Sequence, residues 1–103
     1  MNLEIKKDLT SNWFKTLQDV FCENVCKLER NKLEFKSTRW ERSTKKDEGG
    51  GEYRILKDGK IFEKIGINFS EVYGKFPKQF QKKIPGAQKD PRFWASGISV
   101  VMH

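Results

Sequence analysis

The chain has 103 residues, of which 36% are hydrophobic, 34% charged and 13% aromatic, and its formal net charge is +7. This length predicts one domain, and the aromatic content argues against a disordered chain. No apolar run is long enough to cross a membrane, and the N-terminal segment lacks the apolar core of a signal peptide. The sequence therefore predicts a single domain over residues 1–103 of a cytoplasmic protein.

The positive charge is concentrated in residues 75–92, which hold six basic side chains and one acidic side chain. Such a run is usually a solvated loop, but it also suits a polyanion such as nucleic acid, an anionic membrane surface or a small polycarboxylate. Phe76, Phe80 and Phe93 lie within or beside it, and single-strand nucleic-acid binders combine aromatic and basic side chains in this way. Nucleic-acid binding is therefore one hypothesis, although no known nucleic-acid-binding motif is present.

Cys22 and Cys26 are four residues apart and would share one face of a helix. A zinc site needs two further ligands, and the single histidine, His103, is far away in the sequence. A structural disulfide is uncommon in a cytoplasmic protein. We therefore expect two reduced, partly buried thiols.

The first predicted element is an amphipathic helix over residues 10–31, because apolar residues recur there with helical spacing. The apolar stripe consists of Trp13, Leu17, Val20, Phe21, Val25 and Leu28. We expect this stripe to pack on a sheet, and nothing in the helix indicates chemistry.

The next elements are predicted strands. Residues 33–42 alternate enough to form one, with Leu33 and Phe35 on one face; Trp40 either joins them or follows a kink at Ser37. The polar, glycine-rich residues 43–51 follow and predict a loop.

A β-hairpin is predicted over residues 53–70, with Asp58-Gly59 as a two-residue turn. This turn would place Lys57 opposite Lys60 and Arg54 opposite Glu63. A last strand is predicted over residues 93–103. The expected fold class is thus α+β, an N-terminal amphipathic helix packed on an antiparallel sheet.

Alternation sorts the side chains of the last two strands into two faces. One face is apolar and should meet the helix: Ile61, Ile65, Ile67, Phe69, Ile98, Val100 and Met102. The other becomes small and polar beyond Lys64, and it holds Phe62, Lys64, Gly66, Asn68, Ser70, Gly97, Ser99, Val101 and His103. Small residues leave room for a ligand to approach a sheet; the alternative is a plain solvated face.

The glycines at 49–51 do not form a phosphate-binding loop, because they lead into a strand and no Lys-Ser or Lys-Thr pair follows them. A single histidine also gives no basis for assembling a Ser-His-Asp set.

The segment from Trp40 to Pro77 reads W-x-R…GGG-x-x-R-I-L-x-D-G-x-I-F-E-K-I-G-I-N-F-S-x-V-x-G-x-F-P. It resembles the signature of oxygen-dependent coproporphyrinogen III oxidase, and F-W-A-S-G-I-S-V-V-M-H at the end of the chain resembles a later motif of that family. The resemblance implies oxidative decarboxylation of two propionates of coproporphyrinogen III in heme biosynthesis, giving protoporphyrinogen IX with O2 as oxidant. It also implies a helix-flanked antiparallel sheet, a homodimer, no organic cofactor and a divalent metal of disputed role.

The same resemblance suggests site residues. Ser99 matches a substrate-contacting serine, and His103 matches a histidine sometimes assigned as a metal ligand. Weaker matches add three substrate-binding candidates: Asn68, Ser70 and Arg54. Purely structural roles are the alternatives: Ser99 would fit a tight strand crossing, and Arg54 would pair with Glu63.

The family continues past the position of His103 with a segment H-x-N-x-R, whose histidine is its proposed proton donor. The resemblance therefore covers the N-terminal portion of the family, and no catalytic residue is assigned here. We expect the chain alone to lack appreciable oxidase activity and to self-associate or pair with a C-terminal complement. A non-catalytic dimerisation or interaction fragment is the second hypothesis, beside the nucleic-acid binder.

Overall fold

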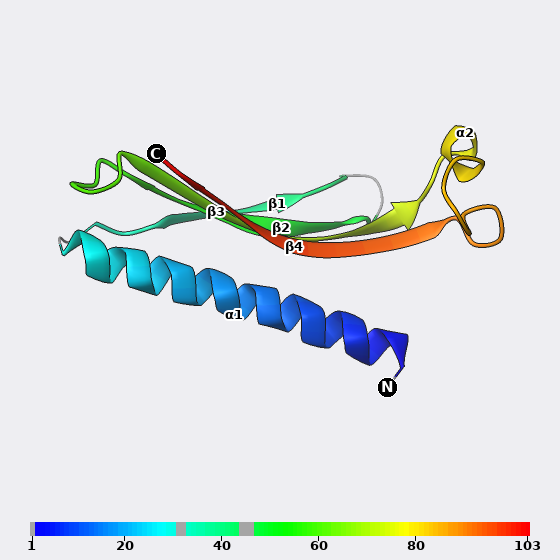
Figure 1. Cartoon of the computed structure of the whole chain (residues 1–103), viewed down its shortest axis with the longest axis horizontal. Helices are drawn as coiled ribbons and strands as arrows, with labels where there is room; N and C mark the ends of the chain where they lie inside the picture. Colours follow the sequence, from blue (N-terminus) through cyan, green and yellow to red (C-terminus); the bar gives the residue numbers. More distant parts are fainter. Residues whose placement is uncertain (1, 31–32, 44–46) are drawn as a thin grey trace.

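The computed structural model describes residues 2–30, 33–43 and 47–103. In chain order the elements are helix α1 (Leu3–Glu29), strands β1 (Lys36–Glu41), β2 (Gly49–Lys57) and β3 (Lys64–Lys75), the short helix α2 (Lys78–Gln81) and strand β4 (Arg92–Met102). The four strands form one antiparallel sheet in the order β1-β2-β3-β4, and α1 runs along one of its faces (Figure 1). The predicted α+β fold is confirmed.

Helix α1 begins earlier than the periodicity predicts. The side-chain oxygen of Asn2 accepts a hydrogen bond from the backbone N–H of Ile5 at 2.9 Å, which caps the helix. The helix ends at Glu29 and is followed by the C-cap residue Arg30, whose φ of 53° is left-handed. Residue 31, the predicted end, lies outside the described residues.

The predicted packing stripe of α1 is wrong. Four of its members are exposed, namely Trp13, Val20, Phe21 and Leu28, and Val25 is buried. The positions of α1 that are buried share a different stripe: Ser11, Gln18, Cys22, Val25 and Glu29. Helical spacing located the helix but could not choose between two stripes, because the sheet-facing stripe is partly polar.

Polar side chains are tolerated on that stripe because each has a hydrogen-bonding partner in the rest of the protein. The Gln18 amide donates to the carbonyl oxygens of Glu52 and Ile67, at 2.8 and 3.1 Å. The Ser11 hydroxyl donates to a carboxylate oxygen of Glu71 at 2.6 Å. Buried polar groups paired in this way avoid the cost of losing their water contacts.

The core lies between α1 and the middle of the sheet. Leu56, Ile65 and Ile67 are fully buried, and they cluster with Cys22 and Val25 of α1. Burial of Ile65, Ile67 and Phe69 confirms the predicted apolar face of β3. The prediction of burial fails for Ile61, which lies before β3 and is 58% exposed, and for Met102 at the end of β4, which is 44% exposed.

The first predicted strand is shorter than expected. Strand β1 starts at Lys36, while Leu33 and Phe35 precede it and pack against the core. Trp40 does not join them, because its indole contacts Asn68 on the other side of the sheet.

The turn between β2 and β3 is not the predicted two-residue turn. Lys57 pairs with Lys64 instead of Lys60, so residues 58–63 form the connection. Asp58 adopts the positive φ that the Asp-Gly pair predicts, at 62°. Because the register shift is an even number of residues, every side chain of the paired strands keeps its predicted face.

The shift also removes the predicted pairing of Arg54 with Glu63, since Arg54 lies opposite Ile67. The longer connection, and with it the shifted register, is explained by Glu29 at the end of α1. The Glu29 carboxylate accepts backbone N–H groups from Lys60, Ile61 and Phe62, at 2.7, 3.2 and 2.9 Å.

This contact holds the longer connection open against the helix. Burial alone would raise the pKa of Glu29, but the three N–H donors hold that pKa below its ordinary value. The Asp58-Gly59 pair predicts a two-residue turn, but the contact with Glu29 favours the longer connection.

The glycines at 49–51 lie in β2, so the predicted loop is wrong at this point. A Cβ at Gly50 would lie 2.2 Å from the Trp40 carbonyl oxygen, and one at Gly51 would lie 1.9 Å from the Phe69 carbonyl oxygen. Glycine is needed here because neighbouring backbones approach closely. Residues 44–46 of the predicted loop lie outside the described residues.

The connection between β3 and β4 carries α2 and projects beyond one end of the sheet (Figure 1). The Phe76 and Phe93 rings stack at its base with centroids 4.9 Å apart. Among the helices described, none is long and apolar enough to cross a bilayer.

Candidate functional site

Three predicted site residues come together on the face of the sheet away from α1, which we call the open face. Asn68 of β3 lies directly opposite Ser99 of β4, and Ser70 lies opposite Gly97. Side chains two residues apart on a strand share a face, so these three residues form one small, polar patch. Asn68 and Ser70 are half-buried and Ser99 is exposed.

His103 follows β4 and is held by its backbone. Its N–H donates to the Lys64 carbonyl at 2.9 Å, and its own carbonyl accepts the Glu63 N–H at 2.8 Å. Alternation places it on the side of Ser99, about 13 Å further along the strand. No group of three or more His, Cys, Asp or Glu side chains that could hold a metal occurs among the described residues, so these residues do not by themselves build a metal centre around the exposed His103.

Arg54 lies on the opposite face, beneath α1, and is not brought together with the other candidates. Its guanidinium contacts Asp19 of α1 at 2.7 Å and Glu52 at 2.5 Å. Burial opposes the positive charge, but these carboxylates dominate and raise the pKa of Arg54. The described contacts of Arg54 therefore connect the helix to the sheet.

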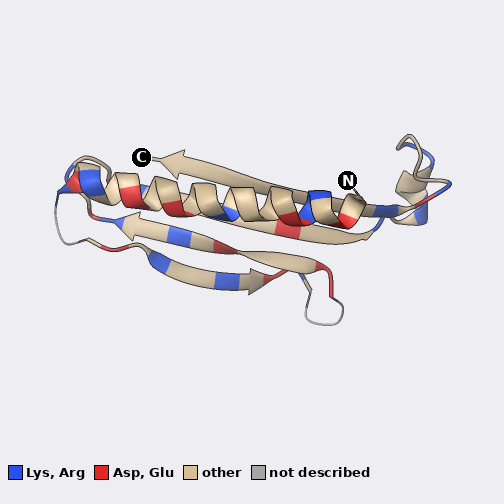
Figure 2. Ribbon diagram, turned by 90° about the horizontal axis from the view of Figure 1, so that it is seen from below, with Lys and Arg blue, Asp and Glu red and all other residues tan. Residues whose placement is uncertain are grey.

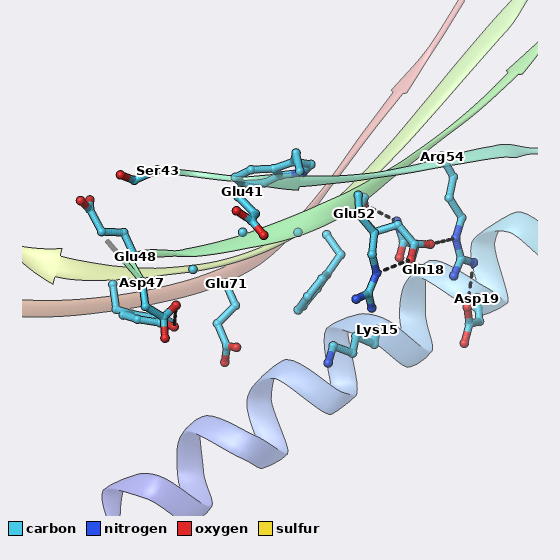
Figure 3. Close-up of a pocket in the computed structure, with 17 residues that line it drawn as sticks. Lys15, Gln18, Asp19, Glu41, Ser43, Asp47, Glu48, Glu52, Arg54 and Glu71 are labelled. Carbon is cyan, nitrogen blue, oxygen red and sulfur yellow. Dashed lines mark hydrogen bonds and ion pairs between the residues drawn. The ribbon is translucent and has the colours of Figure 1, made fainter. Parts of the chain in front are cut away.

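Arg54 borders a hollow of about 760 Å³ between α1 and the ends of β1 and β2 (Figure 3). In Figure 2, β1 lies to one side of the helix axis instead of directly beneath the helix. Carboxylates outnumber cations in the lining of the hollow. The acidic residues are Asp19, Glu41, Asp47, Glu48, Glu52 and Glu71, and the basic ones are Lys15, Arg39 and Arg54.

Two of these acidic residues hold the rim of the hollow together. The Tyr73 hydroxyl donates to Asp47 at 2.5 Å, and this bond raises the pKa of Tyr73. Glu48 lies 3.4 Å from Arg42. A hollow with this excess of negative charge suits a cation and disfavours a polycarboxylate.

The open face carries a second, smaller hollow of about 370 Å³ with the opposite charge balance. It is lined by two lysines, one glutamate and three uncharged residues: Lys36, Lys57, Glu34, Thr38, Tyr53 and Ile55. Tyr53 lies opposite Asn68, so this hollow adjoins the polar patch. Lys64, paired with Lys57, adds a further cation to this end of the open face.

The sequence interpretation missed two residues of the open face, Trp40 and Tyr53. The Trp40 indole N–H donates to the Asn68 side-chain oxygen at 3.0 Å. Alternation along β2 and β3 would have placed Tyr53 beside Asn68, had the register been known. No sequence signal locates Trp40 there, because its position depends on the order of three strands.

Both cysteines are free thiols on α1. Burial raises the pKa of Cys22, although Arg54 opposes the shift. The Cys26 sulfur lies 3.8 Å from the Leu33 carbonyl oxygen. These contacts give the thiols a packing role on the helix side.

Of the basic residues at 75–92, Lys75 and Arg92 pair at the end of β3 and β4, and the others lie on the β3–β4 connection beyond the end of the sheet (Figure 2). Arg92 pairs with the acidic residue of this segment and lowers the pKa of Asp90 to about 2. Phe80 is 45% exposed there. Nothing in this arrangement tests the nucleic-acid hypothesis, which stays a prediction.

The fold and its open face define an α+β domain with a cationic, hydroxyl-bearing and amide-bearing sheet surface, suited to an anionic ligand. Residues 9–103 match the sequence profile of the family described as coproporphyrinogen III oxidase. The chain therefore belongs to the coproporphyrinogen III oxidase family.

Curated relatives agree. The oxygen-dependent coproporphyrinogen-III oxidases of Rickettsia akari (strain Hartford) and Rickettsia africae (strain ESF-5) are each 40% identical to the chain, over 105 and 107 residues. That of Rickettsia typhi (strain ATCC VR-144 / Wilmington) is 41% identical over 107 residues. The matches cover 94 to 100% of this chain but only 36 to 38% of the relatives.

Proposed function

We propose that the chain supplies one wall of the coproporphyrinogen III site of an oxygen-dependent coproporphyrinogen oxidase, and that this wall is the open face. The observation that carries the proposal is the pairing of Asn68 with Ser99, beside Ser70, next to a hollow lined by Lys36 and Lys57. The acidic hollow on the helix side would repel a tetra-carboxylate, so charge favours the open face.

The proposed role of this wall is to bind and orient the substrate. Lys36 and Lys57 would attract propionate carboxylates, and the Asn68 amide and Ser99 hydroxyl would donate hydrogen bonds to them. In the family reaction two propionates lose CO2 and become vinyl groups with O2 as oxidant. No described residue of this chain is proposed as proton donor, so activity requires groups from the part of the relatives that the chain does not span.

The experiment is a fluorescence titration of the chain with coproporphyrin III, the stable oxidised form of the substrate. We expect binding that weakens in Ser99→Ala and with rising salt. Asn12→Ala, on the exposed side of α1, is the control and should bind like the unchanged chain. Absence of binding, or equal binding by Ser99→Ala, would contradict the site.

A second measurement concerns activity. We expect no protoporphyrin fluorescence from coproporphyrinogen III with the chain alone. Activity is expected to appear on adding the C-terminal part of a rickettsial relative. His103→Ala in the mixture tests whether this residue contributes, with and without added divalent metal.

The association state is part of the same proposal. In the described sheet, β4 is an edge strand, and α1 exposes large apolar side chains such as Trp13 at 59% and Leu28 at 57%. An open strand edge and exposed apolar surface favour pairing with another chain. Sedimentation should show self-association or complex formation with the C-terminal part; a monomer indifferent to that part would argue against it.

A further inference from the structure

The contact between Trp40 and Asn68 bridges three strands of the open face. Trp40 is in β1, Asn68 is in β3, and β2 lies between them. The indole N–H reaches the Asn68 side-chain oxygen at 3.0 Å. Both residues are half-buried, so the bond is partly shielded from water.

The indole reaches across β2 because Gly51 has no side chain. A Cβ at Gly51 would lie 2.8 and 2.9 Å from two atoms of the Trp40 ring. Such distances are too short for a real side chain, so this glycine makes the crossing possible. The absence of a side chain at Gly51 therefore leaves the space that the Trp40 ring needs to reach Asn68.

The chemistry of the two groups fixes the orientation of the Asn68 amide. An indole nitrogen only donates hydrogen bonds, whereas an asparagine amide has one accepting oxygen and one donating NH2 group. The oxygen must therefore face Trp40, and the NH2 group is directed elsewhere. Within residues 2–30, 33–43 and 47–103, that NH2 group has no hydrogen-bond acceptor.

The surroundings of this NH2 group favour an anionic acceptor. Its cross-strand neighbours are Tyr53 on β2 and Ser99 on β4, whose side chains end in hydroxyl groups and not in carboxylates. A carboxylate accepts hydrogen bonds without needing to donate any, and bonds to a charged acceptor are the stronger kind.

We propose that Trp40 is a positioning residue, which orients the Asn68 amide so that its NH2 group donates to a carboxylate of the ligand on the open face. This rests on the proposed function for the identity of the natural ligand. The contact itself predicts selectivity for carboxylates over neutral analogues such as amides or esters, because an amide turned the other way would present its oxygen to the ligand.

The test is nuclear magnetic resonance of the 15N-labelled chain, titrated with propionate and, separately, with coproporphyrin III. We expect the side-chain NH2 signals of Asn68 to shift with propionate and to shift much less with propionamide at the same concentration, because a charged acceptor binds an N–H donor more strongly than a neutral carbonyl does. In Trp40→Phe, which keeps an aromatic ring over Gly51 but has no N–H, propionate affinity should fall about tenfold. Trp13→Phe, an exposed tryptophan of α1, should behave like the unchanged chain.

A second variant keeps the proposal testable if Trp40→Phe does not fold. Asn68→Asp retains an oxygen for the indole N–H but replaces the NH2 group by a second oxygen, so it should keep its melting temperature and lose propionate binding. The proposal would be overturned if the Asn68 NH2 signals did not shift with propionate. It would also be overturned if Trp40→Phe or Asn68→Asp bound propionate as tightly as the unchanged chain.

Comparing propionate with coproporphyrin III distinguishes a failure of the proposed role of Trp40 from a failure of the proposed function. If propionate moves the Asn68 signals but coproporphyrin III does not bind, the role of Trp40 stands and the proposed function fails. If coproporphyrin III binds without moving those signals, substrate binding by the chain stands, but the proposed contact of Asn68 with the substrate and the role of Trp40 are both wrong.

Discussion

The two faces of the sheet are built from the same strands but are filled by opposite means. The face beneath α1 buries Leu56, Ile65 and Ile67, and it admits polar side chains only where they are paired, as Gln18 is. The open face carries small and polar residues around Asn68, whose amide NH2 group has no hydrogen-bond acceptor among the described residues. The difference teaches that the face beneath α1 is built for stability, and it supports the proposal that the other face binds a ligand.

The largest expected effect comes from truncating a buried side chain on the face of the sheet beneath α1. Ile67→Ala removes a fully buried side chain and should lower the free energy of unfolding by about 2–5 kcal/mol. Urea denaturation measures this change in the free energy of unfolding. If Ile67→Ala does not fold, Ile67→Val is the milder variant, and it should cost about 0.5–1.5 kcal/mol.

The matched change on the open face is Val101→Ala. Val101 is 53% exposed, so its removal should alter stability by no more than about 0.5 kcal/mol. A cost similar to that of Ile67→Ala would mean that the open face is covered in solution, for example by another copy of the chain.

The next effect sharpens the contrast within the open face itself. Gly51→Ala should destabilise by about 1–3 kcal/mol, because its Cβ would meet a backbone oxygen and the Trp40 ring. Gly66→Ala has free space around its Cβ and should be neutral or stabilise by up to about 1 kcal/mol. Equal thermal melts for the two variants would show that the Trp40 crossing is absent.

A third effect is confined to the connection at residues 58–63. The pKa of Glu29 is lower in the folded chain than its ordinary value. Its stabilising contribution is therefore present above the unfolded-state pKa and is lost as pH falls through the folded-state pKa. Stability should fall on acidification in the unchanged chain and less so in Glu29→Gln.

Hydrogen exchange of the Lys60, Ile61 and Phe62 amides locates this effect, since these three donate to Glu29. The control is Glu23→Gln, an exposed residue of the same helix paired with Lys27. Protection of the three amides that is equal in Glu29→Gln and the unchanged chain would contradict the role of Glu29.

The smallest expected effect concerns Arg54. Asp19→Asn removes one partner of an ion pair whose aspartate side chain is 66% exposed, so we expect a loss below about 1 kcal/mol. Because this pair lies beneath α1, the variant should bind coproporphyrin III like the unchanged chain. Impaired binding would instead assign Arg54 to the substrate site, and Asp8→Asn on the same helix is the control.

Much of the architecture follows from the sequence alone. Alternation in β3 and β4 separated Ile65, Ile67 and Phe69 from Asn68 and Ser70, and the structure keeps that separation. Alternation is robust because a strand has a period of two, so an even error in register leaves the faces intact. The family signature likewise depends only on the order of residues along the chain.

Only the tertiary structure decided the rest. The packing side of α1, the register of the hairpin and the approach of Trp40 to Asn68 each depend on partners distant in sequence: Glu71 and Ile67 for the helix, Glu29 for the hairpin, and Gly51 for the indole. A local pattern fixes the kind of element, because backbone geometry is periodic. Which side of that element is buried, and which polar group is left for a ligand, is determined by the groups that reach it from elsewhere in the fold.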